Sequence, residues 1–227
     1  MQEALTEMEK LQEEQDTTKI QLLVATSINQ ARIATELAPN QVATWETLGM
    51  VYREIRTVAT GAMEWGVKSF EKAITLEPTN PVIYTELGKL YMLTNDTVRA
   101  GEQFVRAIEL KPDYTDALVQ DVLLLEREGD LQGAIRKMKE LVTGFPYSAE
   151  ISFQMGRLYF NNNQITLAIE QFKRVIILAP GHSNAHYSLG VAYAAKGETQ
   201  LAIESFERVL ELNPGNQDVQ EKLRQLR

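Results

Sequence analysis

The chain has 227 residues, of which 44% are hydrophobic, and this is ample for a packed core. Its formal net charge is −8, from 31 Asp and Glu against 23 Lys and Arg, which is the wrong sign for a general binder of nucleic-acid phosphates. The chain contains no cysteine, which excludes disulfides, zinc–thiolate sites and catalytic thiols.

The first forty residues begin as a polar segment and then acquire a helical pattern. A narrow apolar stripe comes first, formed by Met1, Leu5, Met8 and Leu11. Residues 19–38 have the apolar spacing of an amphipathic helix, and Asp16-Thr17-Thr18 can cap its start. We therefore predict a degenerate helical hairpin over residues 1–40. Because the N-terminus lacks the basic start and apolar run of a signal peptide, a cytoplasmic location is favoured, while the compartment stays open.

Beyond residue 40 the sequence repeats at a fixed interval, the distance from Pro78 to Pro112, which we call the repeat period. Three sets of residues keep this spacing: Pro78, Pro112, Pro146, Pro180 and Pro214; Ala100, Ala134, Ala168 and Ala202; and Phe70, Phe104, Met138, Phe172 and Phe206. A Gly followed three residues later by Tyr recurs near the start of the units: Gly49 and Tyr52, Gly88 and Tyr91, Gly156 and Tyr159, Gly190 and Tyr193. The third unit departs from this pattern, with Val122 and Leu125 at these places.

The repeated pattern predicts two amphipathic helices in each unit. The Leu-Gly pair and the Tyr share one helix face, while the Ala and Phe positions form an apolar stripe on a second helix. The small residues let two helices approach closely, the aromatic residue is expected to fill the gap between neighbouring hairpins, and the proline ends the second helix. One hairpin cannot bury both of its faces, so the units must stack.

The signature residues of the first unit are Trp45, Leu48, Gly49, Tyr52, Phe70, Ala73 and Pro78. They resemble the tetratricopeptide repeat (TPR) family, and five copies cover about residues 42–216. The resemblance implies an all-α fold, a right-handed α-solenoid of stacked antiparallel helix hairpins that forms a TPR-like superhelix. The expected division is a degenerate hairpin at 1–40, repeats at 41–80, 81–114, 115–148 (degenerate), 149–182 and 183–216, and a C-terminal capping helix at 217–227.

The first repeat carries five extra residues, because the distance from Pro39 to Pro78 exceeds the repeat period by five. They fall between Tyr52 and Phe70, where they lengthen the turn or add about one turn to either helix. Trp65 stands beside this insertion. We expect it to pack against the preceding hairpin, and the alternative is an exposed contact specific to this protein.

No residue set predicts catalysis, cofactor binding or metal binding. The chain has no nucleotide-binding glycine loop, nucleophile elbow or metalloprotease helix. His182 and His186 stand at i and i+4, a spacing that holds a metal only when both residues are helical. His182 lies in the turn after Pro180, and His186 takes the place of Trp45 in the first repeat. A packing role is therefore preferred, and we predict a non-enzymatic protein without cofactor or metal.

The predicted binding surface lies on the first helix of each hairpin, which lines the concave groove in the family that the sequence resembles. Phe153, Arg157 and Phe160 form one stripe on the first helix of the fourth repeat. Tyr187 follows Phe153 by one repeat period, and Lys89 holds the place of Arg157 two repeats earlier. These residues predict a strip that binds apolar anchors and an acidic group of a peptide. The alternative is that Phe153 and Phe160 only pack against adjacent helices.

The leading prediction is a protein–protein interaction scaffold that binds a peptide or protein segment in its concave groove. We expect no nucleic-acid partner. We also expect no membrane insertion by this segment, because its longest uncharged stretch is interrupted at Pro180. Two alternatives remain: the soluble repeat domain of a larger membrane-anchored or enzymatic protein, and a scaffold that self-assembles into a homo-oligomer.

Overall fold

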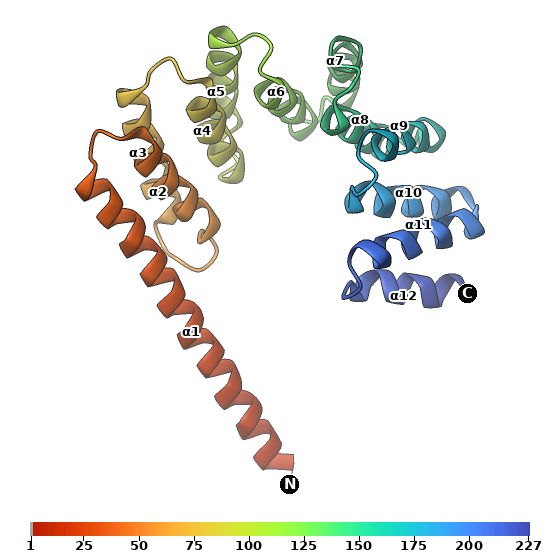
Figure 1. The fold of residues 1–227 in the computed structure, drawn as a ribbon, viewed down its shortest axis with the longest axis horizontal. Helices are drawn as coiled ribbons and strands as arrows, with labels where there is room; N and C mark the ends of the chain where they lie inside the picture. The colour runs from red at the N-terminus through yellow and green to blue at the C-terminus, as the bar shows by residue number, and fades with distance from the viewer. Residues whose placement is uncertain (1) are drawn as a thin grey trace. The chain divides into compact units, whose positions relative to one another are not determined.

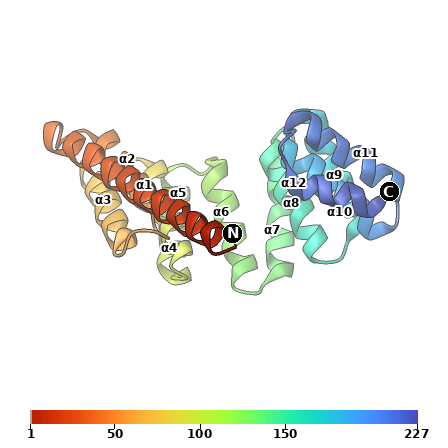
Figure 2. The same cartoon turned by 90° about the horizontal axis from the view of Figure 1, so that it is seen from below.

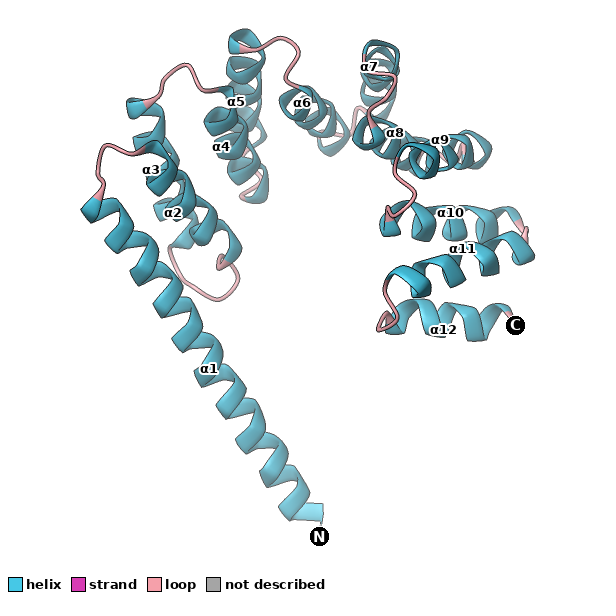
Figure 3. Cartoon of the chain, viewed as in Figure 1, coloured by secondary structure: helices cyan, strands magenta, loops and turns pink. Residues whose placement is uncertain are grey.

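The computed structural model describes the backbone of residues 2–227 and the side chains of residues 18–227. This part of the chain contains twelve helices and no strand (Figures 1 and 3). The helices are α1 (Gln2–Leu37), α2 (Val42–Glu54), α3 (Ala62–Leu76), α4 (Pro81–Leu93), α5 (Thr97–Leu110), α6 (Thr115–Arg127), α7 (Leu131–Gly144), α8 (Ala149–Asn161), α9 (Ile165–Leu178), α10 (Ser183–Lys196), α11 (Thr199–Leu212) and α12 (Gln217–Leu226). The predicted all-α solenoid of helix hairpins is confirmed.

The helices belong to two compact units, Met1–Gln120 and Asp121–Arg227, which we call unit 1 and unit 2. In unit 1, each helix from α1 to α4 contacts the next helix in the chain, so that α5 is the last member of this series. In unit 2, the same holds from α7 to α12, and α10, α11 and α12 lie side by side in two perpendicular views (Figures 1 and 2). Each unit is therefore a stack in which successive helices cover one another.

The prediction of a hairpin over residues 1–40 is wrong, because residues 2–37 form the single helix α1. No Gly or Pro interrupts this segment, and its Glu, Gln, Lys, Ala and Leu residues favour a continuous helix over a cap at Asp16-Thr17-Thr18. Val24, Ile28 and Ala31 dock α1 onto the first hairpin. The side chains of Met1, Leu5, Met8 and Leu11 lie outside the described residues.

Each of four hairpins is closed by a glycine of its first helix that lies under a phenylalanine of its second helix. An added Cβ would come within 2.8, 2.4, 2.6 and 2.8 Å of the nearest ring atom for the pairs Gly49–Phe70, Gly88–Phe104, Gly156–Phe172 and Gly190–Phe206. The four rings are at most 2% exposed. The close helix approach expected from the glycines is thus confirmed. The ring, however, covers the glycine of its own hairpin, whereas the sequence predicted that it fills a gap between hairpins.

The third hairpin has different residues at the Gly and Phe positions of its two helices. Val122 stands where the other hairpins have Gly, and Met138 stands where they have Phe, and both are fully buried. A larger residue on the first helix is accompanied by an unbranched, adaptable side chain on the second. The departure from the signature is therefore an exchange of volume between two core positions.

A second recurring contact ties the start of a hairpin to the end of the preceding segment. Six residues after a proline, a side chain bonds to that proline's carbonyl oxygen: Trp45 Nε1 to Pro39 at 2.8 Å, Tyr84 Oη to Pro78 at 3.0 Å, His186 Nε2 to Pro180 at 3.0 Å, and Gln220 Nε2 to Pro214 at 3.1 Å. His186 is buried by this contact. His182 caps α10, since its Nδ1 accepts a hydrogen bond from the Ala185 amide at 3.1 Å.

The insertion of the first repeat lies in the turn between α2 and α3, at residues 55–61. Trp65 follows this turn and is 55% exposed. Its ring stacks on Tyr52 of the same hairpin with centroids 6.5 Å apart, and the Lys68 ammonium lies 4.7 Å from its centroid. The prediction that Trp65 packs against the preceding hairpin is therefore wrong, and it presents an aromatic surface instead.

Replacing Gly156 with Ala places a methyl group where the Phe172 ring lies, so we expect the variant to lose about 1–3 kcal/mol of unfolding free energy. Urea denaturation followed by far-ultraviolet circular dichroism measures this loss. Gly144→Ala is the matched control, because no atom lies within 4 Å of an added Cβ there. Equal losses in the two variants would show that the glycine–phenylalanine contact does not limit the packing.

Candidate functional site

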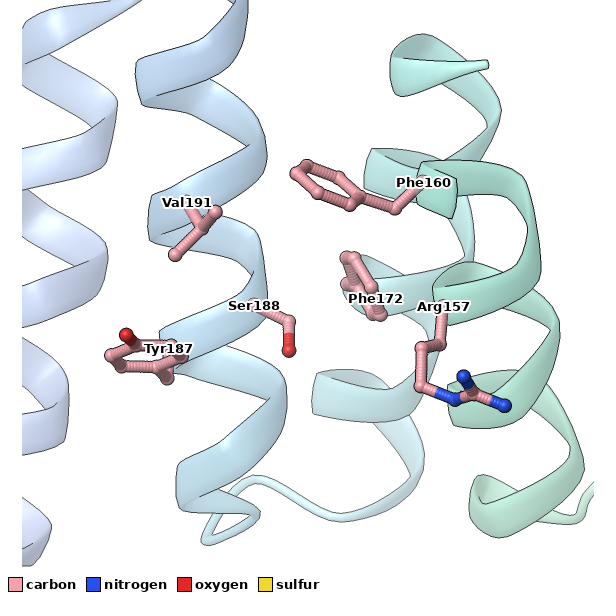
Figure 4. Close-up of a pocket in the computed structure, with 6 residues that line it drawn as sticks. All are labelled: Arg157, Phe160, Phe172, Tyr187, Ser188 and Val191. Carbon is pink, nitrogen blue, oxygen red and sulfur yellow. The ribbon is translucent and has the colours of Figure 1, made fainter. Parts of the chain in front are cut away.

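Unit 2 has a pocket of about 100 Å³ between α8 and α10, which we call the first pocket. Its lining residues are Arg157, Phe160, Phe172, Tyr187, Ser188 and Val191. Phe160 reaches from α8 toward α10, Ser188 points back toward α8, and Phe172 comes from α9 (Figure 4). The walls are largely aromatic and aliphatic, so the first pocket suits an apolar group.

A second pocket of about 190 Å³ follows along the same unit. Its lining residues are Val191, Ala194, Phe206, Lys222, Gln225 and Leu226. These residues come from α10, α11 and α12. Val191 belongs to both pockets, so α10 separates them.

Three of the five residues predicted for binding line the first pocket: Arg157, Phe160 and Tyr187. Phe153 does not line either pocket. Its ring packs on Phe172 and on the His182 ring, with centroids 5.9 and 5.0 Å apart. These contacts agree with the alternative interpretation of the sequence, in which Phe153 packs against neighbouring parts of the repeat and does not bind a ligand. The fifth predicted residue, Lys89, lies on α4 in unit 1.

Arg157 is a paired cation in the structure. Its Nη1 and Nη2 donate to Glu126 Oε1 and Oε2 at 3.0 and 2.5 Å, and its Nε donates to Gln154 Oε1 at 2.9 Å. Such a bidentate pair fixes the guanidinium firmly. Glu126 was missed from sequence. The signal that could have found it is its position one repeat period before Phe160, which puts it at the matching place on the preceding first helix.

Lys89 is also engaged within the chain. Its ammonium donates to Glu86 at 2.8 Å and to Asp116 at 2.7 Å, while Arg53 pairs with the other oxygen of Glu86. Burial alone lowers the pKa of Lys89, but the hydrogen bonds to Asp116 and Glu86 outweigh it, so the pKa is raised. The side chains of Arg53, Glu86 and Lys89 are each at most 25% exposed. The four groups form a ladder of alternating charge along α2, α4 and α6.

Two segments match the family model described as tetratricopeptide repeat, at residues 82–114 and 153–217. The solved structures that resemble the chain include a tetratricopeptide repeat protein from Parabacteroides merdae, which is 16% identical with a TM-score of 0.72 over 92% of this chain and 79% of that one. The chain therefore contains tetratricopeptide repeats. The second matched segment contains all the residues that line the first pocket, but it ends at residue 217, before Lys222, Gln225 and Leu226 of the second pocket.

Other relatives of this chain are larger proteins. The protein adenylyltransferase fic-1 of Caenorhabditis briggsae is 32% identical over 123 residues, which are 51% of this chain and 24% of that protein. Anaphase-promoting complex subunit 3 of Schizosaccharomyces pombe is 26% identical over 56% of this chain and 18% of that protein. The chain thus spans about a quarter or less of these relatives. YrrB, solved as a TPR protein with an unusual peptide-binding site, shares the fold with a TM-score of 0.54 and 20% identity, covering 86% of this chain and 97% of that one.

These similarities support a general role as a protein-interaction scaffold. Among the described residues, no group of three or more His, Asp or Glu is placed to hold a metal ion. None of the helices that the structure describes has the length and apolarity needed to cross a membrane.

Glu46 is the first-repeat counterpart of Phe153 and Tyr187, and it lies in a partly buried acidic setting. Burial, together with the charges of Glu77 and Glu86, raises the pKa of the Glu46 carboxyl above its ordinary value of 4.5. A raised carboxyl pKa means that the folded state favours the protonated form. The associated stabilisation is present below the unfolded-state pKa and is lost as pH rises through the folded-state pKa.

We therefore expect Glu46→Gln to melt at a higher temperature than the wild type at neutral pH, because the variant removes a carboxylate that folding desolvates. The difference should disappear as the pH falls below 4.5, where Glu46 is protonated in both states. Differential scanning calorimetry across this pH range measures both effects. The control is Glu102→Gln at an exposed position of α5. A pH-independent difference for Glu46→Gln would contradict the assignment.

Proposed function

We propose that unit 2 binds a peptide or a segment of another protein by inserting an apolar side chain into the first pocket. The pocket's volume of about 100 Å³ suits one side chain. Pockets for drug-sized ligands are much larger, roughly 300–1,000 Å³. A few buried anchors of this kind carry most of the energy of many protein interfaces. The single observation that carries the proposal is this open apolar pocket between two first helices.

The lining residues have separate roles in this binding mode. Phe160, Phe172 and Val191 supply the apolar walls, and Tyr187 and Ser188 stand at the side formed by α10. Because Arg157 is held by Glu126, its aliphatic stem contributes to the wall while its charge is already matched. The peptide-binding description of YrrB agrees with the proposal at the level of the shared fold.

A second candidate is that this binding serves a larger enzyme or assembly. The relatives named as an adenylyltransferase and as a subunit of the anaphase-promoting complex favour it, since the similar stretch is a fraction of each of them. In both candidates the repeats supply the binding surface. Self-assembly is a third alternative, and it predicts that the mass in light scattering rises with concentration in the absence of any peptide.

Ser188→Phe tests the proposal by filling the first pocket without removing any of its walls. The probe is a set of synthetic peptides enriched from a phage-displayed library of random linear peptides on the wild-type chain. We expect their Kd, measured by fluorescence anisotropy, to rise at least about tenfold in the variant, because loss of one buried hot-spot anchor costs about 2 kcal/mol or more and about 1.4 kcal/mol is tenfold in Kd.

Ile177→Phe is the matched control, because it adds the same ring at a position of α9 that is 79% exposed and lines neither pocket. Both variants are first checked for wild-type helicity and melting temperature. Failure to enrich any peptide, or equal Kd values for Ser188→Phe and the wild type, would overturn the proposed function.

A further inference from the structure

The second pocket is the first pocket shifted by one repeat. Five of its lining residues follow five residues of the first pocket by one repeat period: Val191 follows Arg157, Ala194 follows Phe160, Phe206 follows Phe172, Lys222 follows Ser188, and Gln225 follows Val191. Phe172 and Phe206 are the rings that cover Gly156 and Gly190. The two pockets are therefore the same site of the repeat used twice, on the two sides of α10.

The exchanges between the pockets change their chemistry. The second pocket has Ala194 in place of the Phe160 ring and is larger, at about 190 Å³ against 100 Å³. It also has the polar Gln225 in place of Val191, and an ammonium group, that of Lys222, in place of the Ser188 hydroxyl. One pocket is thus suited to an apolar group, and the other to a polar group that carries negative charge.

Lys222 is held much more loosely than Arg157. Its Nζ lies 3.9 Å from Asp218 Oδ1, at the limit of an ion pair, and the other oxygen of Asp218 accepts a hydrogen bond from Tyr187 Oη at 2.9 Å. The ammonium also lies 5.9 Å from the centroid of the Tyr187 ring. Glu221, its neighbour in sequence, accepts hydrogen bonds from Arg224 at 3.2 Å and from Gln225 at 3.1 Å. The Lys222 ammonium therefore keeps donors for a ligand, whereas the Arg157 guanidinium is fixed by a bidentate pair.

We propose that the second pocket binds an acidic side chain of the same partner segment, three residues from the apolar anchor. This inference rests on the proposed function of the first pocket. Neighbouring packed helices lie about 8–10 Å apart, which sets the step from one pocket to the next. In an extended polyproline-type chain with about 3.1 Å per residue and three residues per turn, residues i and i+3 lie on one side about 9 Å apart. An extended segment with an aliphatic residue and Asp or Glu at this spacing reaches both pockets.

The pockets differ in charge at two positions, and the cation at one of them, Arg157, is already paired with Glu126, so the experiment exchanges the residues of the other position. Lys222→Ser gives the second pocket the residue of the first, and Ser188→Lys gives the first pocket the residue of the second. The same random-peptide library is selected on the wild type and on each variant, with the whole 227-residue chain. Arg224→Ser is the matched control, because it removes a cation from the same helix at a position that lines neither pocket.

On the wild type we expect enriched peptides with an aliphatic residue and an acidic residue three positions apart. Replacing that acidic residue with its amide should raise the Kd for the wild type about tenfold, as expected for a hydrogen-bonded charge pair. The same replacement should have little effect on Lys222→Ser. Selection on Ser188→Lys should enrich peptides in which an acidic residue replaces the aliphatic residue of the motif, so that both positions are acidic. Selection on Arg224→Ser should enrich the same motif as the wild type.

The outcomes separate the two proposals. If Ser188→Phe abolishes binding but the enriched peptides lack an acidic residue, or Lys222→Ser leaves the motif unchanged, the inference about the second pocket is overturned and the first pocket stands. A motif with a seven-residue spacing, which indicates a bound helix, overturns the extended geometry. If Ser188→Phe leaves binding unchanged, the proposed function itself is rejected.

Discussion

In four of the five repeats, the contact between a glycine of the first helix and a phenylalanine of the second helix sets the geometry of the hairpin. The contact leaves no room for a Cβ on the glycine, so it fixes the closest distance at which the two helices of a hairpin can pack. In unit 2, two of these rings also line the pockets. Phe172 lines the first pocket and Phe206 lines the second. A core contact and a candidate binding surface thus share one side chain in the fourth and in the fifth repeat.

The third repeat shows which part of this constraint is essential. Val122 and Met138 replace the Gly and the Phe and are both fully buried, so what the fold requires is a filled volume rather than these two residue types. The first repeat shows a different tolerance, because its extra residues lie in the turn at 55–61 without interrupting α2 or α3. Volume in the core is fixed, while the length of a solvent-facing turn is free to change.

The repeat period made most of the fold predictable from the sequence. This one spacing placed the prolines, the Gly and Phe positions and the hairpins, because the same packing has to be solved in every unit. The prediction failed at residues 1–40, where no periodic partner exists and cap residues were weighed above an uninterrupted run of helix-forming residues. It also failed for Trp65, because an insertion removes the register from which its contacts could be inferred.

The candidate site was predicted only in part, because the sequence does not show which side chains of neighbouring hairpins contact each other. Helical spacing correctly brought Arg157, Phe160 and Tyr187 to one pocket, but it could not show that Phe153 packs on His182 or that Arg157 is bound by Glu126. Such pairings depend on side-chain directions between neighbouring hairpins. Lys222 was missed as well, although a shift of the first pocket by one repeat period would have found it.

We propose that a partner segment binds unit 2 in the pockets lined by Phe172 and Phe206, the rings that cover the hairpin glycines. A crystal structure of the whole chain with one enriched peptide tests it most directly. We expect an apolar side chain of the peptide between Phe160 and Ser188, in contact with the Phe172 ring. A peptide that lies on the outer surfaces of α9 and α11, with the space beside Phe172 unfilled, would contradict it.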